Sequence, residues 1–284
     1  DMSRCTSTQQ MFYSTPFYQP LDAWDMSSCV DMSAMFYQDE EFNQPLNTWN
    51  TGNVTNMSSV FYGGNGTMSF NQPLSNWDTS KVTQMQQLFR ACRSFNHPLV
   101  TDGNKWDVSK VTDMSGMFYL CKAFDQDLSS WDVSSVEDFS TMFRDADAFN
   151  QDLSSWNTGS AIRMSFTFSF TSSFNGDIST WDVSNVTNMI GMFRSASAFN
   201  QDLSSWNTSN LTNMKEMFYA ANSFDGDLSN WDVSNVTTMN NSFLQAFSFT
   251  GKGLSTWRPS SALTSMVQTF YSTALAADTD LGAW

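Results

Sequence analysis

Carboxylates recur at fixed positions along the chain, and they are the side chains best placed to do chemistry. One file directly follows a tryptophan and comprises Asp25, Asp78, Asp107, Asp132, Asp182 and Asp232. A second file directly precedes a Leu or Ile and comprises Asp127, Asp152, Asp177, Asp202 and Asp227. Such residues cap turns, because their side chains bond to nearby backbone. The alternative is a binding face: the first file would contact a partner, and the second would hold calcium, which prefers several oxygen ligands.

The sequence offers few residues for a catalytic site or for a histidine-based metal site. His97 is the only histidine, so neither a nucleophile–histidine arrangement nor a histidine-based metal site is indicated. We expect no enzymatic activity and no cofactor, with calcium as the alternative. A file of threonines raises ice binding as another alternative; it comprises Thr6, Thr55, Thr83, Thr112, Thr187, Thr212 and Thr237.

All of these files follow a repeat that is set by the tryptophans. They stand mostly 25 residues apart, at Trp24, Trp49, Trp77, Trp106, Trp131, Trp156, Trp181, Trp206, Trp231, Trp257 and Trp284. A period of this length is typical of repeat architectures. We therefore expect residues 1–284 to form one repeat domain of about eleven rungs rather than several globular domains.

The apolar residues within one repeat predict the elements of a rung. In the copy that begins at Trp181, Trp181 and Val183 alternate with a polar residue as in a strand. From Val186 to Ala196 the apolar residues follow the three-and-four spacing of one helical face. The predicted fold is an α/β solenoid of leucine-rich-repeat type, with a short strand and a short helix in each rung.

The large apolar residues form files that we assign to the core. Phe recurs twelve positions after each tryptophan from Trp24 to Trp231, in a file that runs from the equivalent Phe12 to Phe243, and again eighteen positions after most of them, from Phe42 to Phe249. With the Trp and Met files, these rings are expected to fill the interior of the solenoid in offset stacks.

The four cysteines fall into two pairs at matching repeat positions, Cys5 with Cys29 and Cys92 with Cys121. Adjacent strands lie about 4.7–4.9 Å apart, which is inside the Cα separation that a disulfide accepts. We predict two disulfides, and hence an oxidising compartment. The alternative is that these are small buried residues. Sequons at Asn53, Asn56, Asn65, Asn185, Asn207, Asn210, Asn235 and Asn240 allow glycosylation, although many would arise by chance in this composition.

The composition excludes some partners. The net charge is −15 with 14% charged residues, and no basic stripe is present to neutralise nucleic-acid phosphates. No apolar run approaches the roughly 18 residues of a membrane span.

Two stretches resemble a known family: Leu203-Ser-Ser-Trp206-Asn-Thr-Ser-Asn-Leu211-Thr-Asn-Met214 and Ile178-Ser-Thr-Trp181-Asp-Val-Ser-Asn-Val186-Thr-Asn-Met189. They are similar to BspA-type leucine-rich-repeat surface proteins, in the variant found in mycoplasma lipoproteins. The resemblance runs along the whole chain. It implies a secreted or cell-surface protein for adhesion or structure, without catalytic residues.

Together these features predict a non-enzymatic extracellular protein that binds a protein or glycan. A second hypothesis is a filament of copies stacked head to tail, because Trp284 followed by Asp1-Met2-Ser3 reproduces Trp24-Asp25-Met26-Ser27.

Overall fold

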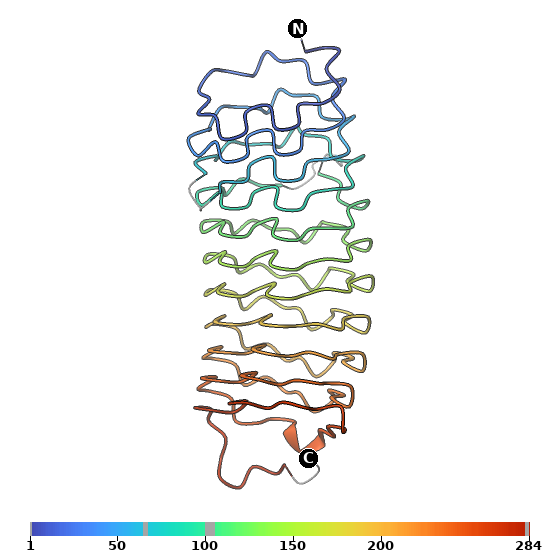
Figure 1. Ribbon diagram of the computed structural model, residues 1–284, viewed down its shortest axis with the longest axis vertical. Coiled ribbons are helices and arrows are strands. Elements are labelled where there is room, and N and C mark those ends of the chain that lie inside the picture. Colours follow the sequence, from blue (N-terminus) through green and yellow to red (C-terminus); the bar gives the residue numbers. More distant parts are fainter. Residues whose placement is uncertain (1, 65–67, 100–105, 282–283) are drawn as a thin grey trace.

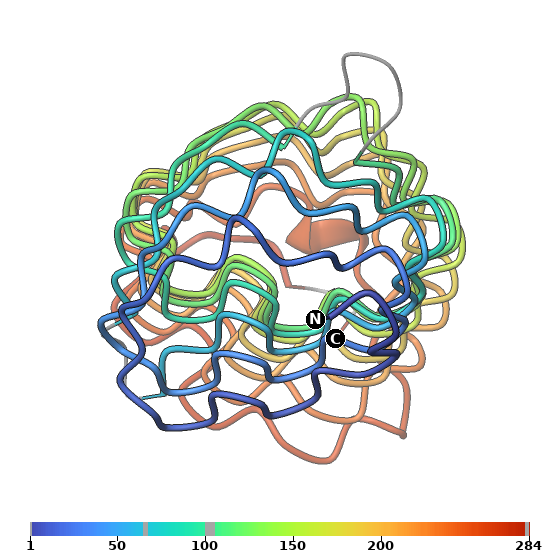
Figure 2. The ribbon, with the colours of Figure 1, turned by 90° about the horizontal axis from the view of Figure 1, so that it is seen from above.

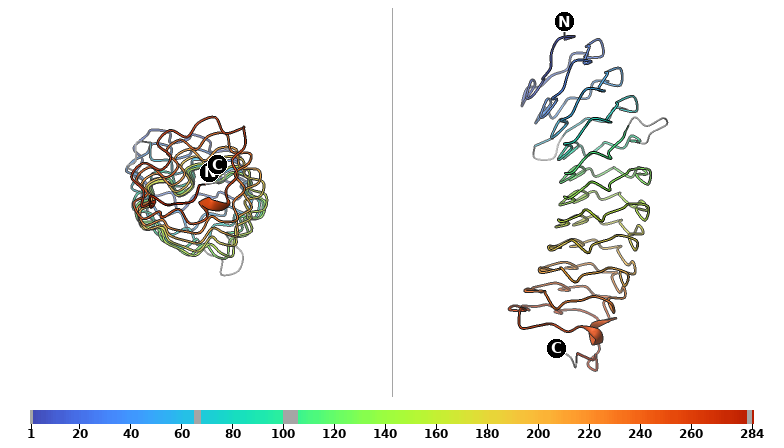
Figure 3. Two further views of the ribbon diagram at one scale, coloured as in Figure 1. Left: turned by 90° about the horizontal axis from the view of Figure 1, so that it is seen from below. Right: turned by 90° about the vertical axis from the view of Figure 1, so that its right-hand side faces the viewer.

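The chain winds into an elongated stack of similar rungs, and its two termini lie at opposite ends (Figure 1). The computed structural model describes residues 2–64, 68–99, 106–281 and 284. Seen from above, successive rungs lie over one another (Figure 2), and a side view shows them lying almost parallel (Figure 3). Asp1, which belongs to the end-to-start comparison, and Asn65 of one sequon lie outside the described residues.

Each rung is built from turns. Met35 N–H donates to the carbonyl of Met32 at 3.2 Å, and Ala34 between them has φ 53°. A positive φ at the third residue is the signature of a type II turn. The same conformation recurs four residues later at Gln38, with φ 59°. Most rungs repeat it ten residues after the tryptophan, at Ala34, Ser59, Gln87, Gly116, Thr141, Phe166, Gly191, Glu216 and Asn241.

The predicted rung of strand plus helix is wrong. Among the described residues the only helix is a single 3-10 turn, η1 (Leu254–Thr256), and no strand longer than one bridged residue occurs. The stretch from Val186 to Ala196, expected to be helical, contains Gly191 and Ser195 at positive φ. Turns that repeat every four residues place apolar side chains inward at nearly the helical spacing, so the pattern did not distinguish the two structures.

Hydrogen bonds between rungs compensate the strained turns. A left-handed conformation costs an ordinary residue about 1–2 kcal/mol. In return Ala34 N–H points out of its own rung and donates to Ser58 O of the next at 2.9 Å. The neighbouring N–H groups alternate between the turn and the next rung. The backbone donors of this face are thereby satisfied without a helix.

Backbone contact between rungs includes a file of single parallel bridges, seven residues after the tryptophan. It runs Ser7, Asp31, Asn56, Gln84, Asp113, Asp138, Arg163, Asn188, Asn213, Thr238 and Ser265. This position lies inside the segment predicted as helix. At the predicted strand, side chains join the rungs instead: Trp206 Nε1 donates to Ile178 O at 3.1 Å, and Thr208 Oγ1 donates to Asp232 O at 3.0 Å.

The core consists of the predicted aromatic files. Phe118 and Phe143, on successive rungs, stack with ring centroids 5.7 Å apart, and Trp206 and Trp231 stack at 6.2 Å. All four rings are almost entirely buried. Each tryptophan after Trp24 donates its indole N–H to the Leu or Ile carbonyl of the rung before. The core assignment of the Trp, Phe and Met files is therefore confirmed.

Candidate binding face

Both predicted acidic files cap turns. In the first file one carboxylate oxygen accepts the backbone N–H two residues later, at 2.9–3.0 Å, in Asp25, Asp78, Asp107, Asp132, Asp182 and Asp232. The second file does the same at 2.8 Å in Asp127, Asp152, Asp177, Asp202 and Asp227. Stacked like charges destabilise a sheet, and these bonds offset that cost.

The electrostatics of the first file agree with this role. The serine two residues later donates hydrogen bonds through its hydroxyl and its backbone N–H. These bonds hold the carboxyl pKa below its usual range in Asp25, Asp132, Asp182 and Asp232. Their carboxylates stay ionised around neutral pH. Asn50, Asn157 and Asn207 make the same bond in other rungs without a charge, which spaces the charges along the stack.

The second acidic file also lines two shallow hollows between rungs. One, of about 550 Å³, is lined by Asp177, Asp202 and the serines and Gln201 beside them. The other, of about 260 Å³, is lined by Asp127, Asp152 and equivalent neighbours. Within the described residues no three Asp, Glu, His or Cys side chains come together in a group that could hold a metal ion. The calcium hypothesis therefore gains no geometric support.

A file of Asn and Asp residues that the sequence analysis did not single out joins the rungs. It lies just after the second Phe of each repeat, at Asn43, Asn71, Asn96, Asp125, Asn150, Asn175, Asn200 and Asp225. Each Oδ1 accepts the backbone N–H at the equivalent position of the next rung, at 2.8–3.2 Å. His97 belongs to this edge, where its Nε2 lies 3.1 Å from Asn71 O. This file stabilises the stack.

The predicted disulfides are absent, because all four cysteines are free thiols. Cys92 Sγ donates to Phe61 O at 3.1 Å and Cys121 Sγ donates to Phe89 O at 2.9 Å. Rungs that stack in register turn equivalent side chains the same way, so each thiol faces the preceding rung's carbonyl rather than its partner. Burial raises the pKa of both thiols, which keeps them protonated.

Cys5 and Cys29 are likewise oriented alike. Cys5 Sγ donates to Ser7 O at 3.1 Å, and Cys29 Sγ donates to Asp31 O at 3.5 Å. Cys29 is buried, as the alternative of a small buried residue expects, whereas Cys5 in the first rung is partly exposed.

The threonine file is also joined to the stack. Thr212 Oγ1 donates to Thr187 O at 2.9 Å, and Thr237 Oγ1 donates to Thr212 O at 3.0 Å. These hydroxyl protons are engaged within the protein.

A different surface feature stands out on the face made by the type II turns. The residue after the first Phe of most repeats is Tyr or Arg, and these side chains stack along the molecule. We call this the Tyr/Arg ladder. It comprises Tyr13, Tyr37, Tyr62, Arg90, Tyr119, Arg144, Arg194 and Tyr219, together with Phe170, which lies between Arg144 and Arg194 in the rung where the residue after Phe168 is the buried Ser169. The sequence shows it as recurring Phe-Tyr and Phe-Arg pairs. The sequence analysis did not predict the ladder, because a helical rung would not be expected to stack these side chains on one another from rung to rung.

The ladder is continuous. Tyr37 stacks on Tyr13 at 4.7 Å and on Tyr62 at 4.2 Å between ring centroids, nearly parallel in both cases. The Arg90 guanidinium lies 5.0 Å from the Tyr62 centroid and 4.4 Å from that of Tyr119. Such cation–π contacts are worth about 0.5–2 kcal/mol each, more where water is excluded.

Arg144 and Arg194 extend the alternation. Arg144 lies 5.2 Å from the Tyr119 ring and 5.8 Å from the Phe170 ring, and Arg194 lies 5.6 Å from Phe170 and 4.7 Å from Tyr219.

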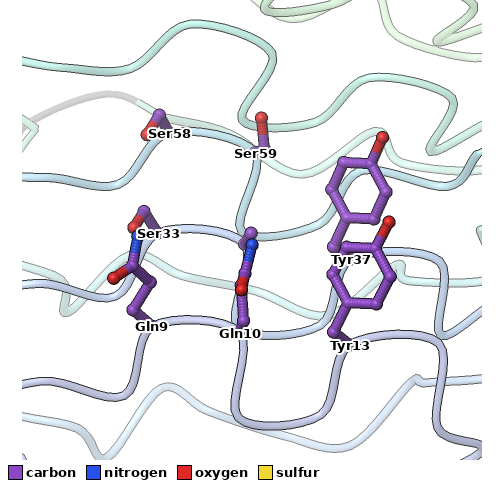
Figure 4. Close-up of a pocket in the computed structure, with 8 residues that line it drawn as sticks. Gln9, Gln10, Tyr13, Ser33, Tyr37, Ser58 and Ser59 are labelled. Carbon is purple, nitrogen blue, oxygen red and sulfur yellow. The ribbon is translucent and has the colours of Figure 1, made fainter.

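A hollow lies beside the ladder in the first three rungs (Figure 4). Its volume is about 360 Å³. Tyr13 and Tyr37 form one side and Gln9, Ser33 and Ser58 the other, while Gln10 and Ser59 lie between them. Ala34, at the same repeat position as Ser59, also lines the hollow. Short side chains at Ala34 and Ser59 keep it open. Hydroxyl, amide and tyrosine groups converge there, as in a site that binds a polar ligand.

The stack of turn-built rungs defines a repeat protein whose core is made of aromatic files. The chain belongs to the family described as "Mycoplasma protein of unknown function, DUF285", which matches residues 6–103, 99–185 and 162–284. No curated protein and no solved structure matches it. Among the described residues there is no helix of the length and hydropathy needed to cross a membrane.

Proposed function

We propose that the protein is a non-enzymatic binding protein of the extracellular or cell-surface type, which contacts a protein or glycan through the face of the Tyr/Arg ladder. The observation behind this proposal is the hollow beside Tyr13 and Tyr37, where hydroxyl and amide groups line a surface supported by stacked rings. The BspA-type surface-protein relationship belongs to the same proposal, because it implies adhesion.

The arrangement of titratable groups supports a role in binding rather than catalysis. The buried thiols are protonated and bonded to carbonyls, and the two acidic files are occupied with turns. The ladder, in contrast, places aromatic and arginine side chains on an outer face of the protein. Residues of these types are enriched at protein interfaces and contribute much of the binding free energy there.

The test fills the hollow without disturbing the turn. Ser59 has φ 57°, and Gln87 occupies the equivalent position of the next rung with φ 59°. Ser59→Gln therefore introduces a side chain that this turn already accepts. The matched control is Thr141→Gln at the same turn position, φ 58°, away from the hollow.

Wild-type and variant proteins are applied to a glycan array with neutral, carboxylated and sulfated oligosaccharides, and to immobilised collagen and mucin. We expect a probe whose affinity falls at least about tenfold, or 1.4 kcal/mol, in Ser59→Gln and is unchanged in Thr141→Gln. If the wild type binds no probe, or if Ser59→Gln binds as the wild type does, the proposal is wrong.

A further inference from the structure

The charge state of the ladder points to the ligand. Arg144 and Arg194 each have an acidic neighbour: Arg144 Nε lies 3.5 Å from Asp145 Oδ2, and Arg194 Nη1 forms a short ion pair with Glu216. Arg90 has no carboxylate within 4.0 Å and no side-chain hydrogen-bond acceptor among the described residues. The Nε atoms of all three arginines are buried without a hydrogen-bond partner, so Arg90 differs from the other two by the missing carboxylate.

Arg4, Arg93 and Arg258 also make no ion pair within the described residues, but they are exposed, whereas Arg90 is half-buried. The Arg90 guanidinium lies 5.0 Å from the Tyr62 ring and 4.4 Å from the Tyr119 ring, so the rings occupy its faces and leave its edge for hydrogen bonds. Being planar and permanently charged, it is suited to bind a carboxylate with two parallel hydrogen bonds.

Acceptor and donor groups accompany Arg90 on the same rung. Gln86 lies four residues earlier, at the equivalent position of the preceding turn, and its buried Oε1 has no partner. The column that contains Gln86 begins with Gln9, Ser33 and Ser58, which line the hollow (Figure 4). Arg90 does not line the hollow and lies one rung beyond Ser59, so a ligand that occupies the hollow must extend by one rung along this face to contact it.

The face fits a glycan better than a peptide. A peptide that adds as a strand needs unpaired backbone groups, but Ser59 N–H and Gln87 N–H already donate to the next rung at 3.0 and 2.9 Å. The rings of the ladder stack on one another, so a ligand can contact only their edges and hydroxyl groups. Beside the rings this face carries a row of Ser and Gln side chains, which can form hydrogen bonds with the hydroxyl groups of a sugar.

The charge of the protein indicates which acidic glycan would suit it. A net charge of −15 repels a densely sulfated polymer, which favours isolated carboxylates. Arg144 and Arg194 already pair with Asp145 and Glu216, so Arg90 is the ladder arginine left for a ligand carboxylate.

Resting on the proposed function, we infer that the ladder face binds a glycan that carries carboxylate groups, and that Arg90 receives one of these carboxylates. The test compares two oligosaccharides of equal length by isothermal titration calorimetry: alternating glucuronate and N-acetylglucosamine, and N-acetylglucosamine alone. The protein variant is Arg90→Gln. Its control is Arg93→Gln, which makes the same charge change at an exposed arginine with no cation–π contact to the ladder.

We expect the acidic oligosaccharide to bind at least about tenfold more tightly than the neutral one, and Arg90→Gln to remove that preference while Arg93→Gln keeps it. Equal binding of the two sugars, or an acidic preference that survives Arg90→Gln, overturns the inference and leaves the proposed function in place. Failure of the acidic sugar to bind also overturns it; the proposed function fails only by the Ser59→Gln test. Melting temperatures of both variants establish that they are folded.

Discussion

Asp39 is the residue that departs most from its own file. It lies fifteen residues after Trp24, where other rungs have a small buried residue such as Cys92, Cys121 or Ala146, and it is only 1% exposed. Its Oδ2 accepts Phe17 N–H at 3.1 Å, but its Oδ1 has no partner. Burial raises the pKa of this carboxyl from 3.8 to about 6, so the folded state disfavours its ionised form.

This gives a pH-dependent prediction for Asp39→Asn. Because the folded pKa is raised, the wild-type free energy of unfolding falls as pH rises from about 4 to 6 and is then constant. Asn keeps an acceptor for Phe17 N–H and carries no charge. We expect Asp39→Asn to be more stable by about 2–3 kcal/mol at pH 7.5, with little difference near pH 4. Urea unfolding at the two pH values measures it.

Asp132→Asn is the control for that experiment. Asp132 is exposed, and the pKa of its carboxyl is lowered by its bonds to Ser134. Asn at Asn157 makes the same turn, so this variant should stay within about 0.5 kcal/mol of the wild type. An equal change in the two variants, or an Asp39→Asn effect that does not depend on pH, would contradict our account of the buried carboxyl.

The element of this fold is the type II turn, and its strain is concentrated at residues with positive φ. Thr141 has φ 58°, and it is β-branched. Such a residue is an outlier in the left-handed region. The rungs on either side of this part of the stack include Gly116 and Gly191 at the equivalent position, with φ 61° and 57°.

Thr141→Gly should therefore stabilise the protein. Relief of about 1–2 kcal/mol of left-handed strain exceeds the added backbone entropy of glycine, about 0.5–1 kcal/mol, so we expect a net gain of up to about 1 kcal/mol in thermal unfolding. Ser140→Gly is the control: its φ is not positive, so only the entropy cost remains and the variant should be less stable. If both glycine variants destabilise the protein equally, the turn assignment is wrong at this position.

The turns also explain how far the sequence could lead. The 25-residue period and the inward files at Trp181, Phe193 and Phe199 depend only on which side chains avoid water, and they were predicted correctly. The backbone between them was not, because inward side chains every four residues suit a string of turns as well as a helix. Choosing between these requires knowing that Phe166 or Glu216 adopts positive φ, which their residue types disfavour.

The candidate site was out of reach for the same reason. The sequence shows that Tyr37 and Arg90 each follow a core Phe. If the rungs were helical, the nearest side chains to these residues would come from the next helical turn of the same rung, not from the adjacent rung. Only in-register stacking of turns brings Tyr62, Arg90 and Tyr119 face to face. Conversely, the aspartates after the tryptophans were predicted as a binding face because they form a row of charges. In the structure each caps its own turn, as Asp182 does by accepting the Ser184 N–H.

At the scale of the molecule, each rung contacts only its neighbours. Trp231 Nε1 donates to Leu203 O, Phe193 stacks on Phe168 and Phe218, and Asn175 Oδ1 accepts from Asn200 N–H. In such a stack the free energy of folding is approximately a sum of rung and interface contributions. Rungs of equal length are then interchangeable, provided that the files stay in register.

Removal of residues 182–206 tests this interchangeability. The deletion begins just after Trp181 and ends with Trp206, so Asn207 follows Trp181 as an Asp or Asn follows most other tryptophans. Phe218 then meets Phe168, and Trp231 meets Ile178. We expect a cooperatively folded protein whose calorimetric unfolding enthalpy is lower by roughly 15–20 kcal/mol, from about 0.7 kcal/mol per residue near 60 °C.

Deletion of residues 182–193 alone removes half a rung and leaves Trp206 opposite positions that are not equivalent to it; this variant should lose cooperative unfolding. Similar behaviour of the two deletions would mean that register between the files does not determine stability, and the stacked rung would then not be the unit of this fold.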